Sequence, residues 1–300
     1  MKHRFRNNLL YYLLVCTGSL VLILPYRMAL LLGKMLGAMA YYFAARDRKI
    51  AIDNLTSVFG NEKSPREIKS IAKKVFVNLG VNTIEFAFLK KTRGKNIDDI
   101  VTVEGFEHAE NAFAKGRGIV ACSAHFGNWE LIAVYFALKG FPVNVIARKI
   151  RFEKFNEMLN NARRANKINV LDRDDAFKQA IRHLKNNEVI AVLGDQDVRA
   201  LDGVFVDFFG RKAYTPSGPA VMAMLSKAAM LPILILRDGY KHKIILQKPV
   251  ELPETGDRKK DILIMTQRYS DAIALYIRKY PEHWVWMHKR WNTKEQGASN

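Results

Sequence analysis

One short stretch of the sequence combines the residue types of acid–base chemistry. Residues 119–130 read IVACSAHFGNWE, in which an apolar run precedes His125, and Glu130 follows five residues later. An imidazole exchanges protons near neutral pH, and a carboxylate bonded to one ring nitrogen fixes its tautomer and stabilises the imidazolium. His125 is therefore a candidate general base for a hydroxyl nucleophile, with Glu130 as its carboxylate partner.

The elements around these two residues decide whether they can meet. We expect a strand over residues 118–123 and a helix over 129–138, which places His125 on the turn between them. In open α/β sheets, ligands bind at the carboxyl ends of strands. Side chains on one helix face are three or four residues apart, so the five-residue spacing does not place both residues on one face. It allows His125, on the turn, to fold back toward Glu130 on the helix. A purely structural hydrogen bond fits the same spacing, so spacing alone leaves both interpretations open.

A second polar block follows another apolar run. Residues 194–197 read GDQD directly after a strand predicted over 189–193, which makes Asp195 a candidate site residue. We expect Asp197 to pair with a nearby arginine. No cluster of His and Cys has metal-ligand spacing, so we predict no metal. Ser217 lies in TPSG rather than in a Gly-x-Ser-x-Gly elbow, which favours a general-base mechanism without a covalent intermediate.

Donors for an anionic substrate are also present. Basic side chains outnumber acidic ones between residues 148 and 167, and Arg148, Arg163 and Arg164 are candidates for binding phosphate or carboxylate groups. A solvated basic helix face is the alternative. An oxyanion could be stabilised by the Asn128 side chain, by backbone N–H groups near Gly127 or by an arginine.

The charge balance restricts the class of partner. The 48 Lys and Arg against 29 Asp and Glu give a formal net charge of +19, which implies nucleic acid or a membrane surface as the anionic partner. A hydrophobic content of 49% excludes a disordered chain. The two cysteines are predicted to be buried free thiols, as in a reducing compartment.

The N-terminus favours the membrane over nucleic acid. Residues 9–24 carry no charge and follow a basic start, so we predict a membrane anchor over residues 1–25. Sixteen helical residues span about 24 Å, slightly less than the roughly 30 Å hydrocarbon core. A short transmembrane anchor, a hairpin in one leaflet and a buried core helix all remain open. Residues 28–45 are predicted to form a second, amphipathic helix.

The remaining chain, residues 26–300, is predicted to be one domain. From residue 100 onward, apolar strand patterns alternate with helical patterns, which indicates an α/β fold with a central mixed, largely buried β-sheet flanked by helices. Residues 64–67 read SPRE, a capping box that opens a helix. The tryptophans near the C-terminus are predicted to pack the domain or to lie at a membrane interface rather than to stack nucleic acid bases.

With these blocks in place, the chain resembles the late acyltransferases of lipid A biosynthesis, the lauroyl and myristoyl transferases of the lysophospholipid acyltransferase superfamily. The resemblance covers nearly the whole chain. The matching blocks, in the family's order, are residues 125–130, which fit the family's His-x4-Asp/Glu motif, then 194–197, 204–210 with 215–219, and 280–291. One departure is Asp207, where the family often has proline.

The resemblance implies a glycerolipid acyltransferase-like fold, an acyl carrier protein thioester as donor and no cofactor. It implies an anionic glycolipid acceptor, a lipid A precursor, at the cytoplasmic face of the bacterial inner membrane, and no role for nucleic acid. By the same match His125 is the base, Glu130 its partner, Arg163 or Arg164 an important arginine and Asp195 a site residue. Alternatives are acylation of a lysophospholipid or another glycolipid, or a non-catalytic basic membrane-surface protein.

Overall fold

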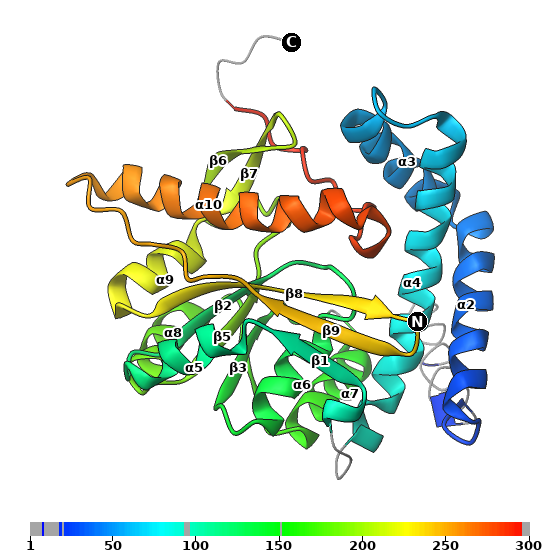
Figure 1. Cartoon of the computed structure of the whole chain (residues 1–300), viewed down its shortest axis with the longest axis horizontal. Helices are drawn as coiled ribbons and strands as arrows, with labels where there is room; N and C mark the ends of the chain where they lie inside the picture. Colours follow the sequence, from blue (N-terminus) through cyan, green and yellow to red (C-terminus); the bar gives the residue numbers. More distant parts are fainter. Residues whose placement is uncertain (1–7, 9–17, 20, 93–96, 151, 296–300) are drawn as a thin grey trace.

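A seven-stranded, mostly parallel sheet forms the centre of the structure (Figure 1). The computed structural model describes residues 8, 18–19, 21–92, 97–150 and 152–295. The strand order is β1-β9-β8-β2-β5-β3-β4, in which only β8 and β9 pair antiparallel. The strands are β1 Val101–Glu104, β2 Ile119–Ser123, β3 Val143–Ala147, β4 Ile168–Asp172, β5 Val189–Leu193, β8 Ala229–Asp238 and β9 Lys241–Leu246. The predicted mixed sheet is confirmed.

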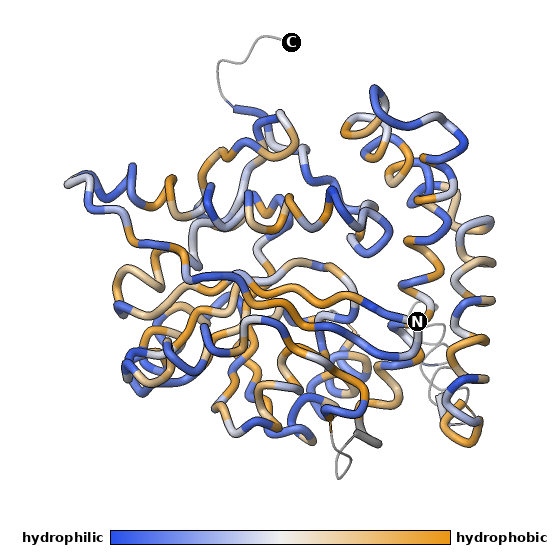
Figure 2. Tube along the Cα trace, in the orientation of Figure 1, coloured by the Kyte–Doolittle hydropathy of each residue, from blue (hydrophilic) through white to orange (hydrophobic). Residues whose placement is uncertain are grey.

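Helices cover both faces of this sheet, which explains why its strands are nearly continuous apolar runs. In β2, Val120 and Cys122 face one core while Ile119 and Ala121 face the other. The first core is completed by α8, α9 and α10, and the second by α5 and α6. In Figure 2 the central strands are mostly orange, whereas the flanking helices change colour along their length. The helices are α5 Phe106–Ala114, α6 Glu130–Leu138, α7 Glu153–Ala165, α8 Ala176–Lys185, α9 Gly218–Ser226 and α10 Arg258–Lys279.

A two-stranded antiparallel hairpin packs outside the main sheet. It comprises β6 Gly203–Phe208 and β7 Arg211–Pro216. The connecting residues Phe209 and Gly210 both have positive φ, 55° and 73°, as a two-residue type I′ turn requires. Asp207, the departure from the family pattern, lies in β6, where its N–H donates to Gln267 Oε1 of α10 at 2.8 Å. A proline there has no N–H for this hydrogen bond.

Three helices precede the sheet, at the right side of Figure 1. They are α2 Tyr26–Phe43, α3 Ala45–Phe59 and α4 Pro65–Thr92. Helix α2 confirms the amphipathic helix predicted over 28–45. The capping box is also confirmed, because Ser64 N donates to Glu67 Oε2 at 2.8 Å and Glu67 N to Ser64 Oγ at 3.4 Å.

Helices α2 and α4 pack backbone to backbone through glycines. A Cβ added to Gly37 would meet the carbonyl oxygen of Phe76, and one added to Gly80 would meet that of Gly33. The face of α2 that carries Ala29, Gly33 and Gly37 is therefore buried against α4. The close approach requires the absence of side chains at these positions.

The predicted anchor over residues 1–25 lies largely outside the described residues. In the part that the structure describes, no single helix is both long and apolar enough to cross a bilayer. Helices α2 and α3 meet that condition only as a pair, and they are bent by 89° at the break between them.

We predict that Gly80→Ala destabilises the fold. Helix propensity alone favours alanine by about 1 kcal/mol. The added methyl group, however, meets backbone atoms of α2, and such overpacking costs about 1–3 kcal/mol. Urea unfolding measures the difference, with Ser70→Ala on the exposed side of α4 as a control expected to change stability by less than about 0.5 kcal/mol. A stabilised Gly80→Ala protein would contradict the close packing.

Candidate active site

The central turn of the site follows β2. Strand β2 ends at Ser123, and helix α6 begins at Glu130, so residues 124–129 form the connection. Parallel strand β5 lies beside β2 with Ser123 opposite Leu193. The residues two positions beyond each strand end, His125 and Asp195, are therefore brought together at one edge of the sheet. The predicted strand-end position of His125 is confirmed.

Asp195 is the carboxylate that contacts His125. Its Oδ1 lies 2.8 Å from His125 Nδ1, and its Oδ2 accepts hydrogen bonds from the His125 backbone N–H at 2.9 Å and from Trp284 Nε1 at 2.7 Å. The Asp195 side chain is 1% exposed and that of His125 is 20% exposed. The pair leaves Nε2 of the imidazole facing the rest of the site, as a general base requires.

Burial and charge act against each other on this pair. Burial lowers the pKa of His125, but the adjacent Asp195 and, more weakly, Glu130 raise it, and the net pKa lies above the ordinary value. For Asp195, burial raises the pKa, but the charge and hydrogen bond of His125 with the Trp284 N–H hold it well below the usual range. Asp195 is therefore ionised at neutral pH and stabilises a protonated His125.

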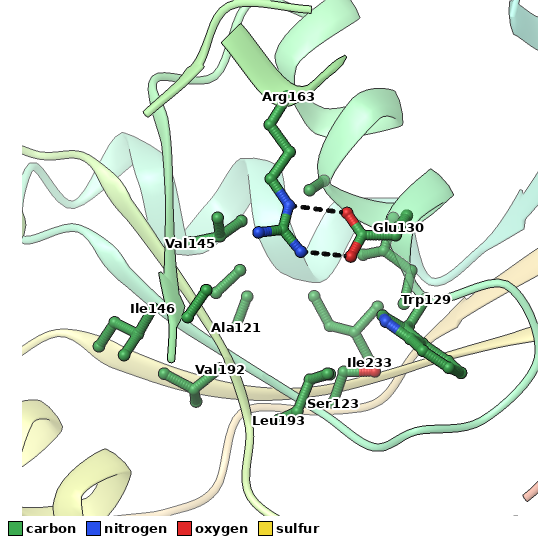
Figure 3. Close-up of a pocket in the computed structure, with 14 residues that line it drawn as sticks. Ala121, Ser123, Trp129, Glu130, Val145, Ile146, Arg163, Val192, Leu193 and Ile233 are labelled. Carbon is green, nitrogen blue, oxygen red and sulfur yellow. Dashed lines mark hydrogen bonds and ion pairs between the residues drawn. The ribbon is translucent and has the colours of Figure 1, made fainter. Parts of the chain in front are cut away.

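Glu130 does not bond His125, contrary to the expectation from the sequence. Its carboxylate accepts two hydrogen bonds from Arg163, from Nε at 3.0 Å and from NH2 at 2.6 Å (Figure 3). Such bidentate pairs fix both side chains in position. Glu130 lies on the first turn of α6 and Arg163 on α7, so the ion pair joins the two helices.

An apolar cavity lies beneath this ion pair. The space between its lining atoms is about 490 Å³, part of it open to solvent. Strands β2, β3 and β5 and helix α6 supply most of the lining (Figure 3). Ser123 also lines it with a hydroxyl that has no hydrogen-bond partner among the described residues. Trp129 lines the cavity and packs edge-on against the His125 ring, 5.0 Å between centroids, so the cavity adjoins the candidate base.

Asn128, predicted as a substrate or oxyanion donor, is instead part of a buried network. It is 3% exposed, and its Nδ2 donates to Glu85 Oε2 of α4 at 2.7 Å. Glu85 also accepts hydrogen bonds from Arg237, from His242 Nε2 at 3.0 Å and from Tyr26 at 3.1 Å. Burial raises the pKa of Glu85, but Arg237 and His242 lower it far more, so this carboxylate is ionised.

Helix α4 also fixes the neighbouring residue of the turn. Asn82 Nδ2 donates to Gly127 O at 2.7 Å, and Gly127 N donates to His283 O at 2.9 Å. Gly127 has a φ of 59°, and a Cβ at this position would meet the carbonyl oxygen of Ile235. The turn is thus held from α4, from β8 and from the C-terminal segment, which leaves His125 little freedom.

The C-terminal segment adds residues to the site that were not predicted. His288 packs against His125 with 4.8 Å between ring centroids, and Gln196 Nε2 lies 3.3 Å from His125 Nε2 and 3.0 Å from His288 Nε2. Burial lowers the pKa of His288 to about 4. Gln196 lies within the 194–197 block and His288 within the 280–291 block, which was the only indication of a role in the sequence. The fold is what places the two blocks together.

The tryptophans of this segment form part of the core. Of the two expectations, packing of the domain is confirmed. Trp284 and Trp286 are fully buried and Trp291 is 8% exposed. Buried rings are not available to stack bases or to enter a membrane interface. Between them, Arg290 is 1% exposed and donates to Tyr214 O at 2.6 Å.

The remaining residues predicted from the sequence are Arg148, Arg164 and Asp197. Arg148 and Arg164 are exposed, Arg148 directly after cavity-lining Ala147 and Arg164 beside Arg163, where it donates to Asn161 Oδ1 at 2.7 Å. Asp197 pairs with no arginine among the described residues, contrary to the expectation; it accepts hydrogen bonds from Thr293 N at 2.6 Å and Thr293 Oγ1 at 2.7 Å.

Comparisons with known proteins match the chain to acyltransferases. Residues 2–293 match the family model of the bacterial lipid A biosynthesis acyltransferases. The chain is 29% identical to the lipid A biosynthesis lauroyltransferase of Escherichia coli K12, over 93% of this chain and 90% of the relative. It is 25% identical to the palmitoleoyltransferase of the same organism, over 92% and 89%. It is 26% identical to a phosphatidylinositol mannoside acyltransferase of Mycolicibacterium smegmatis, over 64% and 62%.

The buried pair predicts a specific pH dependence of stability. Asp195→Asn removes the charge and leaves His125 without its partner. Breaking a buried pair in this way lowers the free energy of unfolding by about 3–5 kcal/mol. The lowered pKa of Asp195 provides stability above about pH 4 that is lost in acid, and the raised pKa of His125 provides stability below about pH 6.5 that is lost as pH rises. The difference between the two proteins should therefore be largest between about pH 4 and 6.5.

Urea unfolding at a series of pH values measures this difference. Asp53→Asn is the control, because Asp53 forms only an exposed pair with Lys49 and its loss should cost less than about 1 kcal/mol. A difference between wild type and Asp195→Asn that does not vary with pH would show that the two side chains are not coupled.

Proposed function

Because the chain belongs to the family of bacterial lipid A biosynthesis acyltransferases, we propose that it transfers a fatty acyl chain from an acyl carrier protein thioester to a hydroxyl group of a lipid A precursor. The observation that carries the proposed chemistry is the pairing of His125 with buried Asp195 beside an apolar cavity. This pairing replaces the predicted His125–Glu130 dyad by a His125–Asp195 dyad.

The proposed reaction needs one base and no covalent enzyme intermediate. His125 Nε2 takes the proton of the acceptor hydroxyl as its oxygen bonds the thioester carbonyl carbon, and the carbonyl electron pair moves onto oxygen. When the tetrahedral intermediate collapses, the carbon–sulfur bond breaks and the thiolate takes the proton back from His125. Asp195 holds Nδ1–H and stabilises the imidazolium formed between the two steps.

The cavity is suited to the acyl chain. Most of its lining is aliphatic, and Trp129, which packs against the His125 ring, is part of that lining. Burying a hydrocarbon chain is favourable by about 0.8 kcal/mol for each CH₂ group. In this proposal the Glu130–Arg163 pair closes one side of the cavity and holds α6 and α7 around the chain, so Glu130 contributes to substrate binding rather than to proton transfer.

Exposed cations near this cavity suit the anionic groups of both substrates. Arg148 and Arg164 are free of carboxylate partners among the described residues. An acyl carrier protein is acidic, and a lipid A precursor carries phosphates. We propose that these two arginines contact one of them. The KM values of the Arg148→Ala and Arg164→Ala proteins show which substrate is bound, and unchanged values for both would exclude this role.

A transfer assay tests the dyad. We expect His125→Ala to lower kcat by about 10²–10⁴-fold, the contribution typical of a positioned general base. The assay incubates membranes that contain the full chain with acyl carrier protein thioesters and an acceptor, and identifies the product by mass spectrometry. His183→Ala is the matched control, because His183 pairs with Glu188 at the opposite end of β5 and should retain activity.

The choice of acceptor decides between related functions. Separate reactions contain a lipid A precursor, a lysophospholipid and a phosphatidylinositol mannoside, the last because one relative is named for it. Transfer to the lipid A precursor alone supports the proposal. Transfer only to one of the other two acceptors would retain the chemistry but replace the substrate, and a fully active His125→Ala protein would refute the mechanism.

We further propose that α2 lies on the bacterial inner membrane. Opposite its buried glycines, this helix exposes large apolar side chains to solvent, each 52–82% accessible: Met28, Leu31, Met35, Met39, Tyr42 and Phe43. Exposed basic residues stand on and beside it, Arg27, Lys34 and Arg46 among them. An apolar face with adjacent cations is typical of helices that lie in the interface of an anionic bilayer.

A fluorescent label tests this surface. In a Cys16→Ser background, Met35→Cys is labelled with an environment-sensitive fluorophore and mixed with vesicles of phosphatidylglycerol and phosphatidylethanolamine. We expect brighter, blue-shifted emission, because the label enters an apolar environment. The control is Leu275→Cys on α10, an equally exposed apolar position outside the proposed surface. Vesicle binding without a spectral change at position 35 would exclude α2 as the contact.

A further inference from the structure

The hydroxyl group of Ser123 is a buried donor without a partner. Ser123 is the last residue of β2 and 6% exposed, and its Oγ has no hydrogen-bond partner among the described residues. Its backbone is fixed, because its carbonyl oxygen accepts hydrogen bonds from Tyr269 Oη at 2.9 Å and from Gly194 N at 3.2 Å. A buried hydroxyl without a hydrogen bond costs stability, and a partner that arrives with the substrate accounts for its presence.

Ser123 stands at the end of the apolar cavity that adjoins the base. Side chains alternate along a strand, so Ser123 lies on the same face of the sheet as Ala121, and both residues line the cavity. His125 follows two residues after Ser123. Trp129, the cavity residue that packs against the His125 ring, lies at the same end of the cavity as Ser123 (Figure 3). With the acyl chain in the cavity, this end is where the chain stops and the thioester carbonyl begins.

The donors that the sequence suggested for an oxyanion are engaged by acceptors within the protein. They are Gly127 N–H with His283 O at 2.9 Å, Asn128 Nδ2 with Glu85 Oε2 at 2.7 Å and Arg163 NH2 with Glu130 Oε1 at 2.6 Å. The backbone N–H groups of residues 128–130, in contrast, have no acceptor among the described residues. Two of them, Trp129 and Glu130, line the cavity and open the nine-residue helix α6, whose N-terminus carries a partial positive charge. Free donors therefore border the same end of the cavity as Ser123.

We propose that Ser123 is a further catalytic residue, whose hydroxyl donates a hydrogen bond to the thioester carbonyl oxygen and, with the N–H groups at the start of α6, stabilises the oxyanion. The proposal rests on the acyl-transfer function above. The Ser123 hydroxyl keeps its own proton, so the acceptor proton still passes to His125 and from there to the thiolate. The hydrogen bond strengthens as the carbonyl oxygen becomes negative, and it therefore stabilises the transition state more than the bound thioester.

Steady-state kinetics of Ser123→Ala test the catalytic role. The loss of one oxyanion donor lowers kcat by about 10²–10³-fold. The KM values for both substrates should change by less than about threefold, because the hydrogen bond is strong only in the transition state. Ser226→Ala is the matched control. Ser226 is 8% exposed, but its hydroxyl donates to Met222 O at 2.7 Å in α9, outside the site, so its kcat should be unchanged.

Urea unfolding separates a catalytic from a structural role. Ser123→Ala removes a buried hydroxyl that has no partner, so its unfolding midpoint should equal or exceed that of the wild type. Ser226→Ala removes a hydroxyl that is hydrogen-bonded, so its midpoint should fall. The two serines should thus behave in opposite ways: one variant loses activity without losing stability, and the other loses stability without losing activity.

An infrared measurement detects the contact itself. The probe is an acyl carrier protein that carries a ketone analogue of the thioester, in which CH₂ replaces sulfur and the carbonyl carbon is ¹³C. This analogue binds but cannot be transferred. Its carbonyl stretch should move to higher wavenumber in Ser123→Ala than in the wild type, because a carbonyl group that loses a hydrogen bond regains double-bond character. The stretch in Ser226→Ala should equal that in the wild type.

Four results would overturn the proposal. They are a Ser123→Ala protein with the kcat of the wild type, a lower unfolding midpoint or failure of this variant to fold, an unchanged carbonyl stretch, and an acyl group found on Ser123 by mass spectrometry during turnover. The last would make Ser123 a nucleophile rather than a donor. Absence of transfer by the wild type itself would instead refute the proposed function, so the two failures are distinguishable.

Discussion

The buried negative charge of Asp195 is the constraint on which the site depends. An ionised carboxylate that is 1% exposed is tolerated only where donors surround it. These three donors come from two distant parts of the chain: the ring and the backbone N–H of His125, and the Trp284 indole. Satisfying one charge therefore closes the C-terminal segment onto the sheet and sets the tautomer of the imidazole. The stability of this region and the geometry of its base have the same physical origin.

Glu85, on the other side of the turn, is a second buried carboxylate that must be surrounded by hydrogen-bond donors. Its carboxylate is satisfied by Asn128 from the turn, Arg237 and His242 from the sheet and Tyr26 from α2. Each of the two buried carboxylates thus ties the loop between β2 and α6 to elements that are remote in sequence. A turn fixed in this way can present a histidine without relying on its own conformational preference.

Local patterns in the sequence were sufficient for much of the sheet and for the position of His125. The run that became β5 has the predicted bounds, because a continuous apolar segment is a local property. Strand β4 has a weaker local pattern, because exposed positions interrupt its apolar residues. The partner of His125 was assigned to Glu130 because proximity in sequence was the only guide. Its neighbour Asp195 is set by the order of β2 and β5 in the sheet, which no local pattern encodes.

The glycine contacts between α2 and α4 also have a mechanical meaning. Where backbones touch without intervening side chains, no rotamer change can absorb a displacement, so the two helices must shift together. Helix α4 also carries Asn82 and Glu85, which form hydrogen bonds with the turn that contains His125. The packing of α2 and the position of the imidazole are therefore connected through one helix, α4.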